Sequence, residues 1–183
     1  QRYLGYRAMQ SRLFAEQAGR DAIDFHPDVK AAMNDPLIKQ QVVTQQQLIQ
    51  ARRAALAADL QGIEENVQGL KEQLASYQNI LVQRRSQLAL LTEELTNTRG
   101  MVKEGYAPRN RQLELERMVA ESNAAIADLT GNSLRVTRQV AELTQRSMVR
   151  KQEYRKEIES QLADVTREVQ SDAEKFVAVS ADL

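Results

Sequence analysis

The sequence contains no cysteine and no tryptophan, and aromatic residues make up 4% of its 183 positions. The absence of cysteine excludes disulfide bonds, thiolate zinc ligands and a thiol nucleophile. His26 is the single histidine, so no pair of imidazoles is available to hold a metal or to share a proton, and we expect it to be an ordinary connector residue. The sequence carries no glycine-rich phosphate loop. We therefore expect no enzyme, no catalytic residues, no metal site and no cofactor.

The sequence also lacks an excess of positive or negative charge. Lys plus Arg number 25 and Asp plus Glu number 25, and the two signs are interleaved along the chain. This pattern argues against a nucleic-acid partner. No run of 18 apolar residues is present, as a membrane-spanning helix would need. The chain begins and ends inside a helical pattern, at Gln1 and Leu183, and we interpret it as a segment of a longer protein.

Apolar residues recur at alternating steps of four and three, the spacing of a left-handed coiled coil. A second run of the same kind follows a short break at 105–108. We call these two runs the seam. The first comprises Leu56, Leu60, Ile63, Val67, Leu70, Leu74, Tyr77, Leu81, Arg84, Leu88, Leu91, Leu95, Thr98 and Val102, and the second Leu115, Val119, Ser122, Ile126, Leu129, Ser133, Val136, Val140, Leu143 and Ser147.

The pattern predicts an all-α fold, an elongated antiparallel coiled-coil hairpin of two long helices with its tip near 105–108 and a short additional N-terminal helix. We expect residues 1–34 to form the N-terminal helix and a connector. Residues 35–183 would form the hairpin, with 35–104 ascending, 105–108 as the tip and 109–180 descending. Asp35 is a suitable N-cap, and Pro36 suits the first helical position.

The N-terminal region reads as a helix over 2–19 that Gly19 ends, followed by a connector over 20–34. Phe25 and Val29 indicate that this connector packs against something. Whether the first helix lies along the hairpin or folds away from it stays open at this point. Tyr154, at seam spacing, is expected to fill the core, and the eleven-residue step from Tyr154 to Val165 locally relaxes the supercoil.

Folding the two runs back on each other requires a register. Setting Val102 against Leu115 places Arg84 opposite Ser133, where both runs carry their least apolar seam residues. Such a polar level fixes register at a cost in stability.

Three of the glycines inside the predicted helices bear on the fold. Gly131 lies within an unbroken seam phase, so we expect the helix to continue through it. Gly62 and Gly69 lie one heptad apart and off the seam. They are either tolerated surface glycines or a site of close approach for the first helix or for a neighbouring subunit.

Two stretches outside the heptads carry a family resemblance. Residues 105–117, GYAPRNRQLELER, resemble the hairpin tip and descending helix of HlyD-like membrane fusion proteins, the periplasmic adaptors of type I secretion systems, in particular the protease and lipase exporters. Residues 11–21, SRLFAEQAGRD, followed by Phe25-His26-Pro27, resemble the segment after the first lipoyl half in that group. The Gln-rich start of the ascending helix, with Arg52-Arg53-Ala54-Ala55-Leu56, is a third similarity.

The resemblance implies an adaptor in the periplasm that is anchored to the inner membrane by a segment outside this chain. Such an adaptor joins an inner-membrane ABC transporter to a TolC-like outer-membrane channel, and six copies form a tube. Asn97 and Pro108 depart from the wider superfamily, which often has Arg and Ser at these tip positions. The alternative reading is a coiled-coil spacer or scaffold unrelated to secretion.

We expect the tip to be the site that docks on the channel. Pro108 disfavours the helical conformation at Ala107, and Gly105 supplies the freedom for the reversal. An exposed tyrosine is not needed for chain reversal, so its presence indicates a contact. The alternative is a plain helix–helix turn with no partner. The predicted partner-binding residues are Met101, Gly105, Tyr106, Ala107, Pro108, Arg109 and Arg111.

Overall fold

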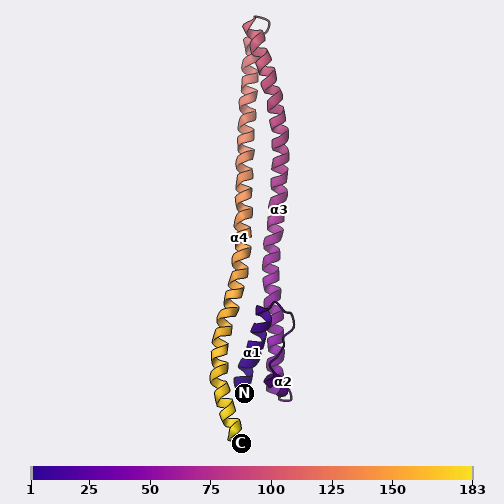
Figure 1. Cartoon of the computed structure of the whole chain (residues 1–183). Helices are drawn as coiled ribbons and strands as arrows, with labels where there is room; N and C mark the ends of the chain where they lie inside the picture. The colour runs from indigo at the N-terminus through magenta and orange to yellow at the C-terminus, as the bar shows by residue number, and fades with distance from the viewer. Residues whose placement is uncertain (1, 183) are drawn as a thin grey trace. The chain divides into compact units, whose positions relative to one another are not determined.

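The computed structural model describes residues 2–182, except for the side chain of Phe176, and the described chain forms four helices and no strand (Figure 1). They are α1 (Arg2–Gln17), α2 (Pro27–Ala31), α3 (Pro36–Lys103) and α4 (Arg109–Ala181). The predicted all-α hairpin class is therefore confirmed. Helix α4 passes through Gly131 without a break, as expected. The short helix α2 was not predicted.

The chain divides into two compact units. The terminal unit comprises Gln1–Gly62 and Arg146–Leu183, and the reversal unit comprises Ile63–Gln145. The predicted domain boundary after residue 34 stays a prediction.

Helices α1 and α3 end in the same way, on a glycine with positive φ. Gly19 has φ 72° and Gly105 has φ 82°. After α1, the amide of Gly19 donates to Glu16 O at 3.2 Å and that of Arg20 to Ala15 O at 2.9 Å. This is the Schellman arrangement, in which the residue after the helix adopts the left-handed conformation that glycine adopts without strain.

Side chains cap α2, which lies inside the connector, and α3, which follows it. The Nδ1 atom of His26 accepts a hydrogen bond from the amide of Asp28 at 3.1 Å at the start of α2. Asp35 Oδ1 accepts one from the amide of Leu37 at 3.0 Å at the start of α3. His26 is thus a helix cap, and Asp35 caps α3 as predicted.

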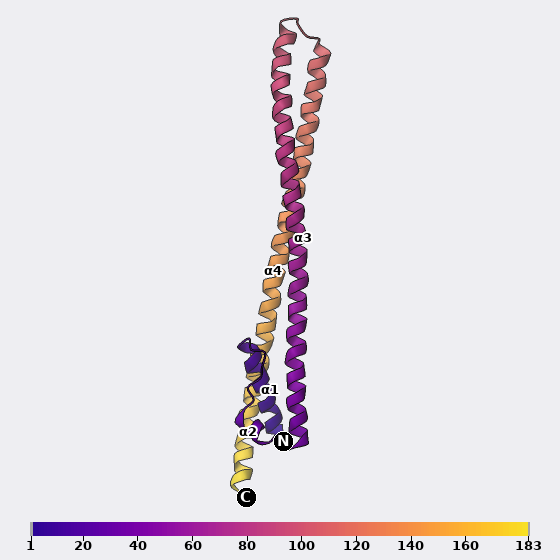
Figure 2. The same cartoon turned by 90° about the vertical axis from the view of Figure 1, so that its right-hand side faces the viewer.

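The terminal unit is a bundle in which α1 lies alongside α3 and α4 (Figures 1 and 2). Helix α1 and the connector share one apolar core with both long helices. The buried members are Tyr3, Leu4, Ala8, Leu13, Phe25, Val29, Ile38, Val42, Ile158, Val165 and Val169. The first helix therefore packs along the terminal part of α3 and α4, and the connector packs on the same core.

The reversal unit buries only its seam. Of the predicted seam residues in this unit, Arg84 is exposed and all the others are buried or half-buried. Leu115 has no exposed surface, and Leu81, Leu95 and Val136 are each 5% exposed. Arg84 follows the pattern of a long cation whose charged head reaches water from a seam position.

Two ion pairs between α3 and α4 set the register of the reversal unit. Arg99 Nη2 lies 3.0 Å from Glu116 Oε1, and Arg111 Nη2 lies 2.7 Å from Glu94 Oε1. The first pair lies on one side of the hairpin and the second on the other, because Glu94 and Arg99 flank the seam residues Leu95 and Thr98 on opposite sides.

The predicted register, with Val102 against Leu115, is wrong. It would set Glu94 level with Asn123, and Arg111 would then lie about twelve residues away, or about 18 Å along the helix axis. An ion pair of 2.7 Å is incompatible with that offset. A slip of one heptad toward the tip brings both observed pairs within reach.

In the corrected register Leu95 lies level with Leu115, and Arg84 lies level with Ile126 and not with Ser133. Ser133 instead donates its hydroxyl to the carbonyl of Leu129 within α4, at 2.9 Å. A slip of one heptad keeps every seam residue in the seam, so heptad spacing alone cannot detect it. The ends of α3 and α4 and the ion pairs decide it.

The corrected register also alternates large and small residues across the seam. Ser133 comes level with Tyr77, and Ser122 comes level with Leu88. Pairing a small residue with a large one lets two helices interdigitate at a constant separation.

The glycines on α3 make no close approach within the described chain. A Cβ added at Gly62 or at Gly69 would meet no atom within 4 Å. This finding excludes contact with α1 as their role. It leaves open the other two readings, a tolerated surface glycine and contact with another copy.

A cysteine pair tests the corrected register. Thr98 is 8% exposed and comes level with the half-buried Gln112. Thr98→Cys with Gln112→Cys should form an intrachain disulfide on mild oxidation, because level residues across the seam meet the short separation that a disulfide needs. Loss of free thiol on a denaturing gel measures this. The matched control, Thr98→Cys with Val119→Cys, should stay reduced, and the opposite result would restore the original register.

Candidate functional site

The reversal between α3 and α4 carries the most exposed large hydrophobic side chain of the described residues. Tyr106 is 77% exposed, and Met101, on the last turn of α3, is 47% exposed. The Tyr106 amide donates to Met101 O at 2.8 Å and the Gly105 amide to Val102 O at 3.1 Å. The backbone of the turn is therefore satisfied without the Tyr106 side chain, whose phenol is left in water.

The rest of the reversal leads directly into α4. Ala107 is half-buried, while Pro108 and Arg109 are exposed. The amide of Arg111 donates to Pro108 O at 3.2 Å, so Pro108 directly precedes α4 and its carbonyl accepts a hydrogen bond from the first turn. The structure thus brings Met101, Gly105, Tyr106, Ala107, Pro108 and Arg109 together at one turn.

Not all the positive charges of the reversal are available to a partner, because some are paired with carboxylates of the same chain. Arg111 pairs with Glu94 at 2.7 Å and with Glu114 at 3.2 Å, and the hydrogen bond to Glu94 raises the pKa of Arg111. The positive charge expected from Arg111 is therefore offset within the chain. Arg109 forms no ion pair with any residue that the structure describes. With Lys103 on the last turn of α3, it is a cation at the reversal that lies outside any ion pair in the described chain.

A second ion pair near the reversal joins Arg99 of α3 to Glu116 of α4, with 3.0 Å between Nη2 and Oε1. The hydrogen bond from Gln112, followed by that from Arg99, lowers the pKa of the Glu116 carboxyl. The carboxyl is exposed, so this ion pair adds orientation more than stability. The reversal therefore presents an aromatic residue, a thioether and one unpaired guanidinium, a surface suited to a small contact with a protein. Its assignment as a binding site stays a prediction.

A second polar cluster, which sequence reasoning missed, lies in the terminal unit. The carboxylate of Glu16 is fully buried and is contacted by three side chains. It pairs with Arg12 one turn before it and with Arg52 Nε at 2.8 Å, and it accepts a hydrogen bond from Tyr154 OH at 2.8 Å. Arg12 also donates to Gln45 Oε1 at 2.6 Å. The cluster joins α1 to α3 and α4.

Burial governs the electrostatics of this cluster. Burial and then the hydrogen bond to Glu16 raise the pKa of Tyr154 to about 12. Burial lowers the pKa of Arg12, while Glu16 opposes that shift. The guanidinium of Arg52 also lies over the Tyr154 ring, 5.3 Å from its centre. Tyr154 was predicted as a core filler, and it is half-buried, but its hydroxyl also anchors the buried carboxylate.

Two sequence signals could have revealed the cluster. Arg12 and Glu16 stand four residues apart on one helix face. Arg52, Leu56 and Leu60 are spaced by two consecutive fours, like Tyr154, Ile158 and Leu162 on α4. In the corrected register these two irregular steps come level, at the place where α1 ends.

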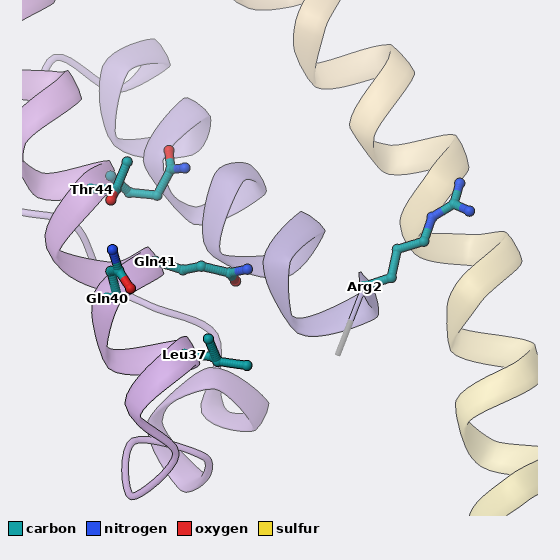
Figure 3. Close-up of a pocket in the computed structure, with 6 residues that line it drawn as sticks. Arg2, Leu37, Gln40, Gln41 and Thr44 are labelled. Carbon is teal, nitrogen blue, oxygen red and sulfur yellow. The ribbon is translucent and has the colours of Figure 1, made fainter.

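An amide-lined hollow of about 410 Å³ lies near the start of α3 (Figure 3). Gln41 points from α3 toward α1, where a Cβ on Gly5 would lie 3.1 Å from its Oε1. The hollow is open and lacks a buried charged group, so it has no feature that fixes a ligand.

The described part of the chain offers no candidate metal site and no helix that could span a membrane. No group of three or more His, Asp or Glu side chains could hold a metal ion among residues 2–182. No helix in the same range combines the length and the apolar character that crossing a bilayer requires.

The chain matches one family model over residues 1–182, described as "AprE, long alpha-helical hairpin". It is 35% identical to the alkaline protease secretion protein AprE of Pseudomonas aeruginosa, over 89% of this chain and 38% of that protein. It is 30% identical to the proteases secretion protein PrtE of Dickeya chrysanthemi, over 86% of this chain and 35% of that protein. The chain thus spans little more than a third of the curated relatives it matches.

A solved structure agrees over almost the whole chain. The soluble domain of LipC, a membrane fusion protein of a type I secretion system, superimposes with a TM-score of 0.93 and is 29% identical. The match covers 98% of this chain and 84% of that one.

Removing the Glu16 carboxylate should destabilise the terminal unit strongly. Glu16→Ala leaves the buried Arg12 without its anion and the partly buried Arg52 with only Glu157, which costs about 3–5 kcal/mol in the free energy of unfolding. Gln17→Ala, at the exposed neighbouring position, is the control and should change it by less than about 0.5 kcal/mol. Urea unfolding followed by circular dichroism measures both. Equal stability of the two variants would show that the cluster is not holding α1.

The raised pKa of Tyr154 predicts a pH dependence. The contribution of Tyr154 to the free energy of unfolding is complete below pH 10.0, the ordinary pKa of tyrosine. It is lost as the pH rises toward about 12, because the folded state disfavours the phenolate. Stability should therefore fall less steeply between these values in Tyr154→Phe than in the unmodified chain. Identical slopes would contradict the hydrogen bond to Glu16.

Proposed function

This chain belongs to the AprE family of long α-helical hairpins, and we propose that it is the hairpin segment of a periplasmic adaptor for type I protein secretion. The adaptor links an inner-membrane ABC transporter to an outer-membrane channel. The observation that carries the proposal is the match of 98% of the chain, at 29% identity and a TM-score of 0.93, to a membrane fusion protein of such a system. The names of AprE and PrtE, both secretion proteins, point the same way.

The proposed partners follow from this role. They are a TolC-like outer-membrane channel at the tip, the ABC transporter, and further copies of the adaptor, six in the assembled complex. The protein works in the periplasm and is held to the inner membrane by a segment outside this chain. The alternative of an unrelated coiled-coil spacer gains nothing from the comparisons, which name secretion proteins.

The tip is proposed to dock on the channel through Tyr106, Ala107 and Arg109. The support is physical: the turn hydrogen bonds are complete without the Tyr106 side chain, which is 77% exposed. Arg109 forms no direct ion pair among the described residues, although its charge contributes to the lowered pKa of the nearby Glu116. Its guanidinium can approach the carbonyl-rich ends of helices, where the helix dipole favours a cation. Met101 adds a flexible apolar contact just below the turn. Gly105, Pro108 and Arg111 hold the turn in shape.

Single cysteines in the full-length protein test this docking. Cysteine at Tyr106, Ala107 or Arg109 should crosslink to the outer-membrane channel during export, whereas cysteine at the exposed mid-helix residue Gln68 should not. A contact this small depends on few residues. Tyr106→Asp combined with Arg109→Glu should therefore reduce secretion about tenfold or more. Equal crosslinking at Gln68, or normal secretion by the double variant, would reject tip docking.

A further inference from the structure

The two ion pairs of the reversal unit distinguish two sides of the hairpin. Arg99 and Glu116 mark one side, and Glu94 and Arg111 mark the other. Residues at seven-residue intervals from these markers lie on the same sides, because a coiled coil repeats every seven residues. The side on which any residue of this unit lies can therefore be stated.

A basic strip runs along α3 on the Arg99 side. Lys71, Arg85 and Arg99 are separated by two heptads each, and all three are exposed. Beside this row lies an apolar row, one helical turn away, that consists of Ala75, Val82 and Ala89. Val82 is 66% exposed, so its side chain is available for a contact with another molecule.

An acidic strip runs along α4 on the Glu94 side. Its charged members are exposed and are spaced by one or two heptads: Glu114, Glu121, Asp128 and Glu142. The row next to it contains Met118, 36% exposed, and the half-buried Ala125. A Cβ at Gly131, beyond that row, would meet no atom within 4 Å.

Four of these charges lack an ion pair of their own. Lys71, Arg85, Asp128 and Glu142 pair with no residue in the described chain, and the two strips lie on opposite sides of the hairpin. No single copy can therefore bring them together. Glu114 and Arg99, nearer the reversal, have partners within the chain.

The two strips correspond in height along the hairpin. In the corrected register Asp128 lies level with Val82, three residues or about 4.5 Å from Arg85. Glu142 likewise lies three residues from the level of Lys71, and Glu114 lies three residues from the level of Arg99. Every second heptad therefore offers an opposite-charge contact between two copies that stand side by side without a shift along the axis.

The strip positions between these pairs bring no like charges together. Arg135 interrupts the acidic strip, and the residue with the same height relation on the basic strip is the uncharged Gln78. Glu121 corresponds in this way to Thr92. Val82, the bulkiest residue of the apolar row, lies level with Asp128, and the small residues Ala125 and Gly131 lie three residues, or about 4.5 Å, to either side of that level. No like charges oppose each other within these strips.

We propose that the acidic strip of α4 binds the basic strip of α3 on a second copy of this chain, with both tips at the same end. The contact is heterologous, so each copy uses α4 toward one neighbour and α3 toward the next, and the assembly closes into a ring when the rotation permits. The occupant is a second copy because a helix of the same length, the same heptad period and matched charge at matched height is what the strip requires.

This inference rests on the proposed adaptor function, which calls for several copies, and it adds the surface that joins them. The competing arrangement uses the uncharged faces of the same helices, with Leu90 of one copy against Ala120 of the next. It lacks the charge match, and the test below includes it.

Crosslinking in the full-length protein distinguishes the two arrangements. Val82→Cys with Ala125→Cys should give a ladder of intermolecular disulfides, because these residues meet only between copies. The matched control, Leu90→Cys with Ala120→Cys, should give none. A ladder from the control alone would overturn the proposal in favour of the uncharged faces, and no ladder from either pair would overturn it outright.

Charge reversal tests the same contact independently. Arg85→Glu should reduce the Val82–Ala125 ladder about tenfold, since like charges then oppose. Adding Asp128→Lys should restore it, whereas adding Arg138→Glu, on the outer row of α4, should not. Failure of Asp128→Lys to restore the ladder would contradict the pairing. If the ladder is missing while tip cysteines still crosslink to the channel, the proposed function stands and only the strip assignment fails.

Discussion

The single apolar seam between α3 and α4 is the constraint on which the rest of the structure depends. It buries one stripe of each helix, with Leu115 fully buried and Leu81, Leu95 and Val136 almost so. Because hydrophobic burial is the main favourable term, this stripe sets the partner of each helix. The remaining faces stay in water, where charge and small residues can be placed for other purposes. Both proposed contacts, at the reversal and along the strips, use faces that the seam leaves free.

The seam changes character where α1 joins. In the terminal unit α1 contributes Leu4, Ala8 and Leu13 to a core shared by three helices. A third helix packs between two others only where their separation increases. The two consecutive four-residue steps of α3 and of α4 occur at the level where α1 packs. The Glu16 cluster lies there as well. A buried carboxylate is costly to desolvate, and two arginines and a tyrosine hydroxyl offset that cost for Glu16, although Arg52 Nη2 is buried without a hydrogen-bond partner. Its value is geometric, since it holds α1 in one place.

The sequence carried enough information to predict the seam, the caps and the reversal, because each of these depends on neighbours along the chain. Gly105 and Pro108 predicted the turn, and Asp35 predicted the start of α3. The register could not be predicted from heptads, since a slip of seven residues leaves every seam residue in place. The prediction of Arg84 against Ser133 was wrong for this reason.

Features that depend on residues far apart were beyond reach. Tyr154 was correctly expected in the core, but its hydrogen bond to Glu16 spans 138 positions, and no local pattern contains it. The role of His26 as a cap depends on α2, a five-residue helix too short to have a periodic signature. The docking role of the tip residues remains a prediction, because a turn looks the same with or without a partner.

The most direct measurement of the central claim is co-purification of the full-length protein with its membrane partners during export. The full-length protein should retain both the ABC transporter and the outer-membrane channel. A variant that lacks the reversal unit, Ile63–Gln145, with α3 and α4 rejoined by a short turn, should retain the transporter and lose the channel. Undiminished recovery of the channel with this variant would contradict the account of the chain as a bridging hairpin.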